Sequence, residues 1–111
     1  MAGKFELKQG ASGKFSFNLK AGNGQVILSS QAYASKSGAL NGIESVRKHA
    51  ASDEYFERKE SKRGEPFFTL NARNGQIIGK SEMYKSVAAR ENGIESVKKN
   101  APDATLVDLT A

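Results

Sequence analysis

The sequence contains 111 residues, of which 17 are Lys or Arg and 12 are Asp or Glu, so its formal net charge is +5. It has no cysteine and one histidine, which excludes disulfides, thiolate chemistry and His-rich metal sites. No apolar run approaches the ~18 residues of a membrane span, and the N-terminus lacks the apolar stretch of a secretory signal. We therefore expect one cytoplasmic domain covering residues 1–111.

The first fifty residues show three strand patterns followed by one helix pattern. Apolar and polar residues alternate in the first two segments, which is typical of half-buried strands. Asn23-Gly24 then predicts a tight hairpin turn, because both turn positions favour positive φ. Ser35 is a suitable N-cap for a helix with apolar residues at helical spacing. The expected elements are strands at 4–8, 14–20 and 26–28 and a helix ending near His49.

The chain is an internal repeat. A shift of 51 residues aligns 5–50 with 56–101 without gaps, and 22 of the 46 aligned positions are identical. The clearest match is Asn41–Val46 with Asn92–Val97, which read Asn-Gly-Ile-Glu-Ser-Val in both copies. Each unit is too small to bury a sound core alone, so we expect the copies to share one core about a pseudo-twofold axis. Repeat one covers about 4–50 and repeat two about 55–101.

Repeat two follows the same plan and is followed by one more strand. It predicts strands at 55–59, 65–71 and 76–79 and a helix from about Ser86 to Asn100. A last strand pattern at 104–109 is expected to close the sheet. The fold class is α+β: two tandem β3-α repeats plus a C-terminal strand, with the helices packed on one face of a shared antiparallel sheet. We expect a monomer with internal pseudo-dimer symmetry.

Few side chains carry recognisable chemistry. Gly10–Phe15 only superficially resembles a phosphate-binding loop, because a strand follows where a helix should. Glu44 and Glu95 are each followed four residues later by Lys, which is the spacing of a helix-stabilising ion pair. His49 lies near the end of the first predicted helix, where it offsets the helix dipole. We therefore predict no enzyme activity, no catalytic residue, no cofactor and no metal.

The sheet face away from the helices is one candidate interaction surface. The alternation places Lys14 and Lys20 there from repeat one and Phe67 from repeat two. An aromatic ring among basic residues on an open sheet is typical of single-stranded nucleic-acid binding. The alternative is that Phe67 packs under a loop or a partner strand. The net positive charge of the neighbouring residues is also low for a polyanion site. Weak nucleic-acid binding is the second function we carry forward.

The outer faces of the two predicted helices form a second candidate surface. Four residues on each helix point away from the apolar stripe and recur in both copies. They are Asn41, Glu44, Ser45 and Lys48 in repeat one, and Asn92, Glu95, Ser96 and Lys99 in repeat two. Core packing does not require identity on a solvent face. The recurrence therefore indicates either incomplete divergence after duplication or a duplicated contact surface for a protein partner.

Several motifs occur together in this chain: Phe5–Lys8, Gly13–Phe15, Leu19–Gly24 and the paired Asn-Gly-Ile-Glu-Ser-Val blocks. They resemble the YegP-like family of small uncharacterised bacterial proteins, in its tandem-repeat form, over nearly the whole chain. The resemblance implies tandem β3-α units sharing one sheet, and no known activity or functional residues. Repeat two departs from the family pattern at Pro66 and at Gly79-Lys80, which leaves the length of its third strand open. We expect a non-enzymatic binding or accessory module acting through protein–protein contact.

Overall fold

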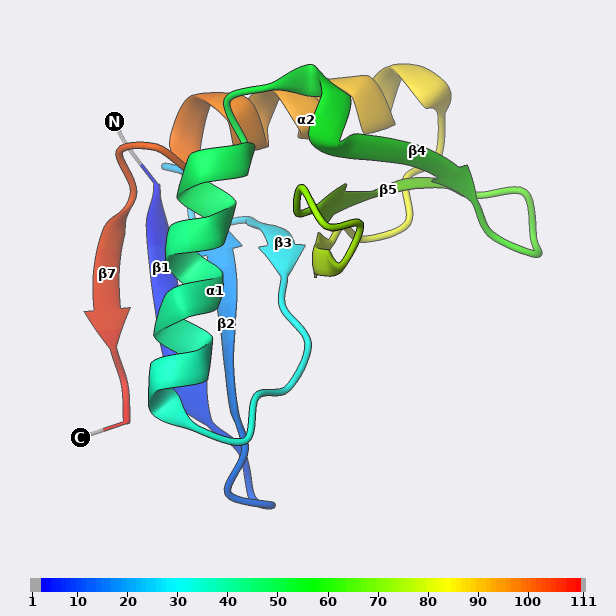
Figure 1. Ribbon diagram of the computed structural model, residues 1–111. Helices are drawn as coiled ribbons and strands as arrows, with labels where there is room; N and C mark the ends of the chain where they lie inside the picture. The colour runs from blue at the N-terminus through cyan, green and yellow to red at the C-terminus, as the bar shows by residue number, and fades with distance from the viewer. Residues whose placement is uncertain (1–2, 111) are drawn as a thin grey trace.

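The computed structural model describes residues 3–110 and confirms the predicted order of elements (Figure 1). Every predicted boundary agrees with the observed one to within one residue. The elements are β1 (Lys4–Gln9), β2 (Phe15–Lys20), β3 (Val26–Ser29), α1 (Lys36–His49), the 3₁₀ turn η1 (Asp53–Tyr55), β4 (Phe56–Glu60), β5 (Pro66–Asn71), β6 (Ile77–Lys80), α2 (Val87–Asn100) and β7 (Thr105–Asp108).

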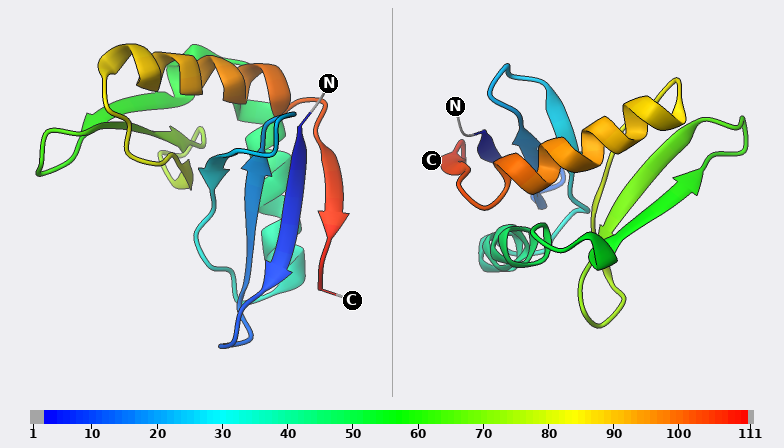
Figure 2. Two further views of the ribbon diagram at one scale, coloured as in Figure 1. Left: turned by 180° about the vertical axis from the view of Figure 1, so that it is seen from behind. Right: turned by 90° about the horizontal axis from the view of Figure 1, so that it is seen from above.

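The seven strands form one sheet in the order β4-β5-β6-β3-β2-β1-β7. Both helices cover one face, and the view from behind in Figure 2 (left) shows β1 and β2 in front of α1. The sheet twists strongly, so that β1 and β2 run at a steep angle to β4 and β5 (Figure 1). The fold is α+β with two tandem repeats, as the sequence predicts.

The direction of β7 differs from the expected antiparallel sheet. β7 pairs in parallel with β1, with Lys4 opposite Thr105 and Leu7 opposite Asp108, so the sheet is mixed. The reason is the place where the chain returns after α2. Thr105 N donates to Gly3 O at 3.1 Å, so β7 starts beside the start of β1 and runs in the same direction.

The two repeats contribute matching halves of one core. Phe5 and Phe17 meet edge to face in repeat one, with 5.8 Å between ring centroids, and Phe56 and Phe68 do the same in repeat two. These rings and the apolar faces of both helices belong to a single buried cluster. Burial of each half therefore depends on the other half.

A glycine near the middle of each helix permits a close contact with the preceding connection. A Cβ at Gly42 would lie 2.5 Å from Tyr33 Oη and 3.0 Å from Phe17 Cε2, and Tyr84 covers Gly93 in the same way. Each tyrosine stacks on a core phenylalanine, with 6.2 Å between ring centroids. The recurring glycine thus makes room for a tyrosine that seals the core edge.

A serine caps the N-terminus of each helix. Gly38 N donates to Ser35 Oγ at 3.0 Å, and Ala89 N donates to Ser86 Oγ at 3.0 Å. Each helix has 14 residues. Among the described residues there is no helix with the length and apolar content needed to cross a membrane.

The two halves of the sheet meet at a narrow junction. β3 and β6 pair at one position, Ser29 opposite Lys80, and the 51-residue shift makes these equivalent residues. The pseudo-twofold axis therefore passes between them. On the helix side, a Cβ at Gly79 would lie 2.6 Å from Leu28 Cδ2. Because Gly79 is itself the equivalent of Leu28, only one leucine fits at the axis.

Candidate binding site at the repeat junction

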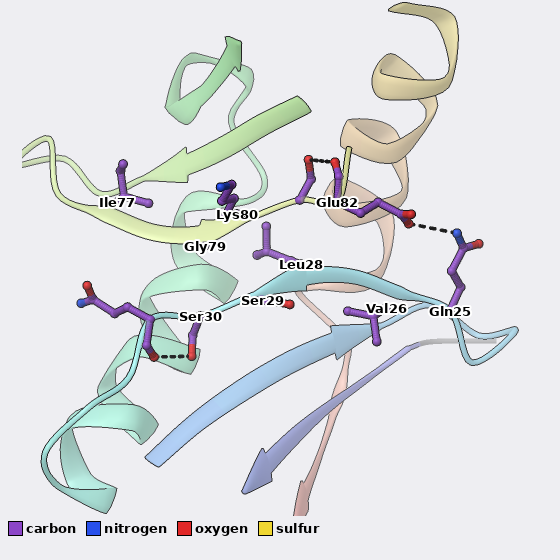
Figure 3. Close-up of a pocket in the computed structure, with 11 residues that line it drawn as sticks. Gln25, Val26, Leu28, Ser29, Ser30, Ile77, Gly79, Lys80 and Glu82 are labelled. Atoms are coloured by element: carbon purple, nitrogen blue, oxygen red, sulfur yellow. Dashed lines mark hydrogen bonds between the residues drawn. The ribbon is translucent and has the colours of Figure 1, made fainter. Parts of the chain in front are cut away.

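A groove lies between β3 and β6, along the pseudo-twofold axis (Figure 3). The strands separate on both sides of their single paired position, and the groove has a volume of about 640 Å³. That volume is within the range of ligand-binding clefts. Equivalent positions of the two repeats form its walls, and we call it the junction groove. Its main pairs are Val26 with Ile77, Ser29 with Lys80, and Gln31 with Glu82.

Two β-bulges turn apolar side chains toward the junction groove. The register between β2 and β3 shifts after Leu19, and the register between β5 and β6 shifts after Leu70. Because each bulge adds one residue, Val26 and Ile77 leave the alternation and face outward. Their exposed fractions are 36% and 43%. Backbone geometry thus places two apolar side chains at matched positions on the open face.

Most polar groups around the junction groove already have partners. The hydroxyls of Ser30 and Ser81 each accept from a backbone N–H of the neighbouring strand, at 2.9 and 3.0 Å. Gln25 Nε2 donates to Glu82 Oε2 at 3.2 Å. Of the two charged side chains in the lining, Glu82 accepts that hydrogen bond, and Lys80 forms no ion pair with the residues that the structure describes. Within residues 3–110, no three His, Cys, Asp or Glu side chains gather to hold a metal ion. The arrangement can hold apolar groups and orient them with one cation.

The three sheet-face residues predicted from the sequence do not lie together. Phe67 is on β5 and Lys20 is on β2, three strands apart, or about 14 Å at ordinary strand spacing. Lys20 forms an ion pair with Glu6 at 2.9 Å, and its hydrogen bond lowers the pKa of that carboxyl. Lys14 is exposed before the start of β2. Lys80 is the cation beside Phe67, with Nζ 5.2 Å from the ring centroid.

The structure gathers the four recurring helix-face residues of repeat two in one cleft. They are Asn92, Glu95, Ser96 and Lys99. The cleft, of about 390 Å³, lies between α2 and the β2–β3 turn of repeat one. Asn100 also lines it, and Asn100 Nδ2 donates to Ser96 O at 2.8 Å; we call it the Asn100 cleft. In repeat one, Asn41 and Glu44 are exposed, Ser45 is half-buried, and Lys48 lines the matching cleft.

The matching cleft lies between the end of α1 and the β5–β6 turn of repeat two, and its volume is about 430 Å³. We call it the His49 cleft. His49 Nε2 accepts from Arg73 N at 3.2 Å, so the ring proton is on Nδ1, which donates to Ser45 O at 2.8 Å. Tyr55 stands edge-on to the imidazole, with 4.6 Å between ring centroids. His49 therefore fastens α1 to the turn of the other repeat.

An ion-pair network covers the outer edge of β4. Arg58 contacts Asp53 at 3.0 Å and Glu91 at 2.9 Å, and Lys98 Nζ lies 2.7 Å from Asp53 Oδ1. Hydrogen bonds from Arg58 and then Lys98 lower the pKa of Asp53 to about 2. Each of the four charges has an opposite charge beside it. The network is therefore suited to holding the edge rather than to acid–base chemistry.

Neither the junction groove nor the His49 cleft is predicted from the sequence. A signal for the groove was present, because Val26 and Ile77 are equivalent apolar residues directly after the Asn-Gly-Gln turns. Strict alternation assigns them to the buried face with Leu28, and the bulges that reverse this leave no mark in the sequence. The His49 cleft depends on contact between a helix of one repeat and a turn of the other. No local pattern indicates that contact.

Comparison with known proteins gives consistent matches along the chain. The model of a domain of unknown function, DUF1508, matches twice, at residues 11–57 and 61–108. A UPF0339 protein of Shewanella oneidensis is 49% identical over 99% of this chain and 100% of its own length. The UPF0339 protein YegP of Yersinia pestis is 47% identical over 97% of this chain and 96% of its own.

Two solved structures match the whole fold. The solution NMR structure of a UPF0339 protein from Shewanella oneidensis superposes with a TM-score of 0.94 at 49% identity, covering 99% of this chain and 93% of that one. The solution NMR structure of a protein of unknown function, yegP, from E. coli superposes with a TM-score of 0.95 at 47% identity, covering 100% and 96%.

Proposed function

The chain belongs to the DUF1508 family of domains of unknown function, and from this premise we propose that it is a non-enzymatic binding module that holds a partner protein in the junction groove. One observation carries the proposal. Val26 and Ile77 are exposed apolar side chains at matched positions of a groove of about 640 Å³, on the sheet face that no helix covers. Grooved apolar surface on an otherwise polar face marks an interaction site.

The chemistry of the groove indicates an extended segment of the partner. Its two apolar positions lie on either side of the Ser29–Lys80 pair, and Lys80, whose ammonium lies beside Phe67 of β5, provides a cation on the β6 side. A segment with two apolar side chains flanking an acidic one is complementary to that order. The apolar side chains supply affinity through burial, and the acidic one fixes direction through Lys80.

A non-enzymatic role is supported by the way the polar groups are used. The Ser30 and Ser81 hydroxyls accept backbone hydrogen bonds, and Glu82 accepts from Gln25. A serine nucleophile needs a base that takes its proton, whereas the Ser30 and Ser81 hydroxyls donate to the backbone carbonyls of Gln31 and Glu82, at 2.7 and 2.8 Å. Binding without turnover is the function that this set of groups fits.

Affinity capture with matched variants tests the proposal. The wild type, V26K/I77K and V87K/L109K are immobilised, where the last pair places the same charge at two apolar sites outside the groove that are each 56% exposed. We expect a protein that V87K/L109K retains and V26K/I77K loses, with or without nuclease. Equal retention by both variants contradicts the groove as the site.

The aromatic and basic sheet face supports nucleic-acid binding as a second candidate. The supporting observation is Lys80 Nζ at 5.2 Å from the Phe67 ring centroid on the open face. Base stacking on Phe67 predicts that Phe67→Ala weakens binding of a labelled single-stranded oligonucleotide roughly 5- to 150-fold. Lys14→Ala serves as a control outside this pair. Wild-type binding no tighter than about 10⁻⁴ M at low salt excludes this candidate.

A further inference from the structure

The His49 cleft gathers cationic and hydroxyl groups. Lys48 enters it from α1 and Arg73 from the β5–β6 turn, and neither forms an ion pair with any residue in the range 3–110. Ser52 and Tyr55 add two hydroxyl groups to the lining. A volume of about 430 Å³ leaves room for a small molecule beside these groups.

The C-terminal end of α1 borders this cleft, and the negative end of a helix dipole disfavours a bound anion. Val46 O accepts from Ala50 N at 2.9 Å. Ser45 O accepts from His49 Nδ1 at 2.8 Å, and His49 O accepts from Ser52 N at 3.2 Å. Three carbonyls at this helix end therefore already accept hydrogen bonds within the chain. The positive charges of Lys48 and Arg73 oppose the negative end of the dipole.

His49 holds the Arg73 backbone in place. The bond from Arg73 N to His49 Nε2 fixes the turn against α1, so the guanidinium starts from an ordered backbone. An arginine held in this way loses less freedom when it forms a paired contact with an oxyanion. Tyr55, edge-on to His49, provides an aromatic wall beside the cations.

The Asn100 cleft provides an internal comparison. Gly22 stands there in the position of Arg73, and Asn100 stands in the position of His49. Glu95 lines that cleft as well, and its carboxylate pairs with Lys98 at 3.1 Å rather than with Lys99, the partner expected from the sequence. The two clefts thus have matching backbone frameworks, and the basic groups accumulate in only one of them.

We propose that the His49 cleft binds the oxyanion of a small organic molecule, a phosphate or a carboxylate, between Lys48 and Arg73. The organic part of the ligand lies against Tyr55. This site is separate from the junction groove, so it stands independently of the proposed function. The Asn100 cleft does not bind the same ligand, because it lacks the second cation.

NMR titration of the full chain tests this site. Inorganic phosphate, phenyl phosphate and benzoate are added at ionic strength held constant with sodium chloride. These probes separate phosphate from carboxylate and test the aromatic wall. We expect saturable shifts of the amides of Lys48, Ser52 and Arg73, tighter binding of the better anion when it carries a ring, and no saturable shift in the Asn100 cleft.

Two variants test whether Arg73 binds the anion. Arg73→Gly gives this cleft the residue of its counterpart and should weaken binding roughly tenfold or more, since a charged hydrogen-bonded contact is lost. Arg63→Gly, in the exposed β4–β5 turn, makes the same change elsewhere and should leave affinity unchanged. If the fold of the Arg73→Gly variant is disturbed, Lys48→Ala measures the same loss. Equal weakening by Arg63→Gly, or no saturable shift with any probe, overturns the proposal.

Discussion

The two edges of the sheet are protected in different ways: a further strand covers β1, and charged side chains cover β4. In repeat one, β7 pairs with β1. Leu7 of β1 lies opposite Asp108 of β7 and is completely buried. In repeat two, no further strand pairs with β4 among residues 3–110, and the equivalent position is Arg58, held by Asp53 and Glu91. Phe56 N donates to Asp53 O, so η1 also occupies one backbone group at that edge. The copies diverge where their surroundings differ.

The inner positions show the opposite behaviour. Ile43 and Ile94 are identical, fully buried, and equivalent in the two halves of the core. The packing around the two positions is the same, so the same side chain fits both. The comparison separates positions fixed by the shared core from positions fixed by the presence or absence of β7. Exchanging residues between repeats is the direct way to test that separation.

Exchange at the edges should give the largest effect. Leu7→Arg places a charge under β7 without a partner and should cost about 3–5 kcal/mol of the free energy of unfolding, the penalty typical of an uncompensated buried charge. Urea denaturation followed by circular dichroism measures it.

The reverse exchange is the control. Arg58→Leu removes exposed ion pairs and should cost only about 1 kcal/mol. Similar losses for Leu7→Arg and Arg58→Leu would show that the two edges are equivalent, contrary to the comparison.

Truncation in the shared core should cost nearly as much. Ile43→Ala and Ile94→Ala each leave a cavity and should each cost about 2–5 kcal/mol, with closely similar values. Thermal or urea unfolding should remain a single transition in both variants. Two resolved transitions, or a cost confined to one repeat, would mean that the halves fold separately.

A substitution at the pseudo-twofold axis should cost less stability, and a second substitution should restore part of it. Gly79→Leu makes the repeats identical at the axis and should cost about 1–3 kcal/mol, because its side chain overlaps Leu28. Adding Leu28→Gly should relieve the overlap, with a coupling energy of about 0.5–3 kcal/mol in a double-mutant cycle. Additive effects of the two substitutions would remove the claim that one leucine fills the axis.

Acid should weaken both edges slightly. The pKa of Asp53 is lowered to about 2 by Arg58 and Lys98, and the pKa of Asp108 is lowered to about 2, mainly by Lys36. A lowered carboxyl pKa stabilises the folded state above the unfolded value, near pH 4, and the effect is lost as pH falls toward 2.

Melting temperatures of the wild type and the Asn variants at these two positions, followed from pH 6 to pH 2, measure this effect. The difference between wild type and each variant should fall steeply as the pH approaches 2, where these carboxyls are about half protonated, and it should diminish in high salt. A difference that keeps its neutral-pH size at pH 2 excludes ionisation as its cause.

The sequence predicts the elements well because local rules govern them. Ser35 and Ser86 cap helices, and the 51-residue repeat implies a shared core. The Asn-Gly turns close hairpins, but only their glycines, Gly24 and Gly75, have positive φ, so the expectation of positive φ at both turn positions is wrong. The direction of β7 could not be predicted in the same way. It depends on the end of the sheet to which α2 returns the chain, and that is a property of the assembled core.

The candidate sites were less predictable, for a physical reason. Strict alternation buries Val26, and only the bulge in register beside Leu19 turns it outward. Arg73 looks like an ordinary turn residue in the sequence. Its role depends on His49, 24 residues away, which accepts a hydrogen bond from its backbone. Both sites form between segments of different repeats, so neither is a property of any single stretch of sequence.

The pairing of β7 with β1 also orders events during synthesis. Lys4 is synthesised 101 residues before Thr105, yet the two lie opposite each other. Until β7 arrives, one edge of β1 lacks its hydrogen-bond partners and Leu7 is uncovered. The nascent chain therefore carries an unpaired strand edge until β7 has been made, which favours slow closure and contact with chaperones. A strand that is made after both repeats thus protects the first strand of repeat one.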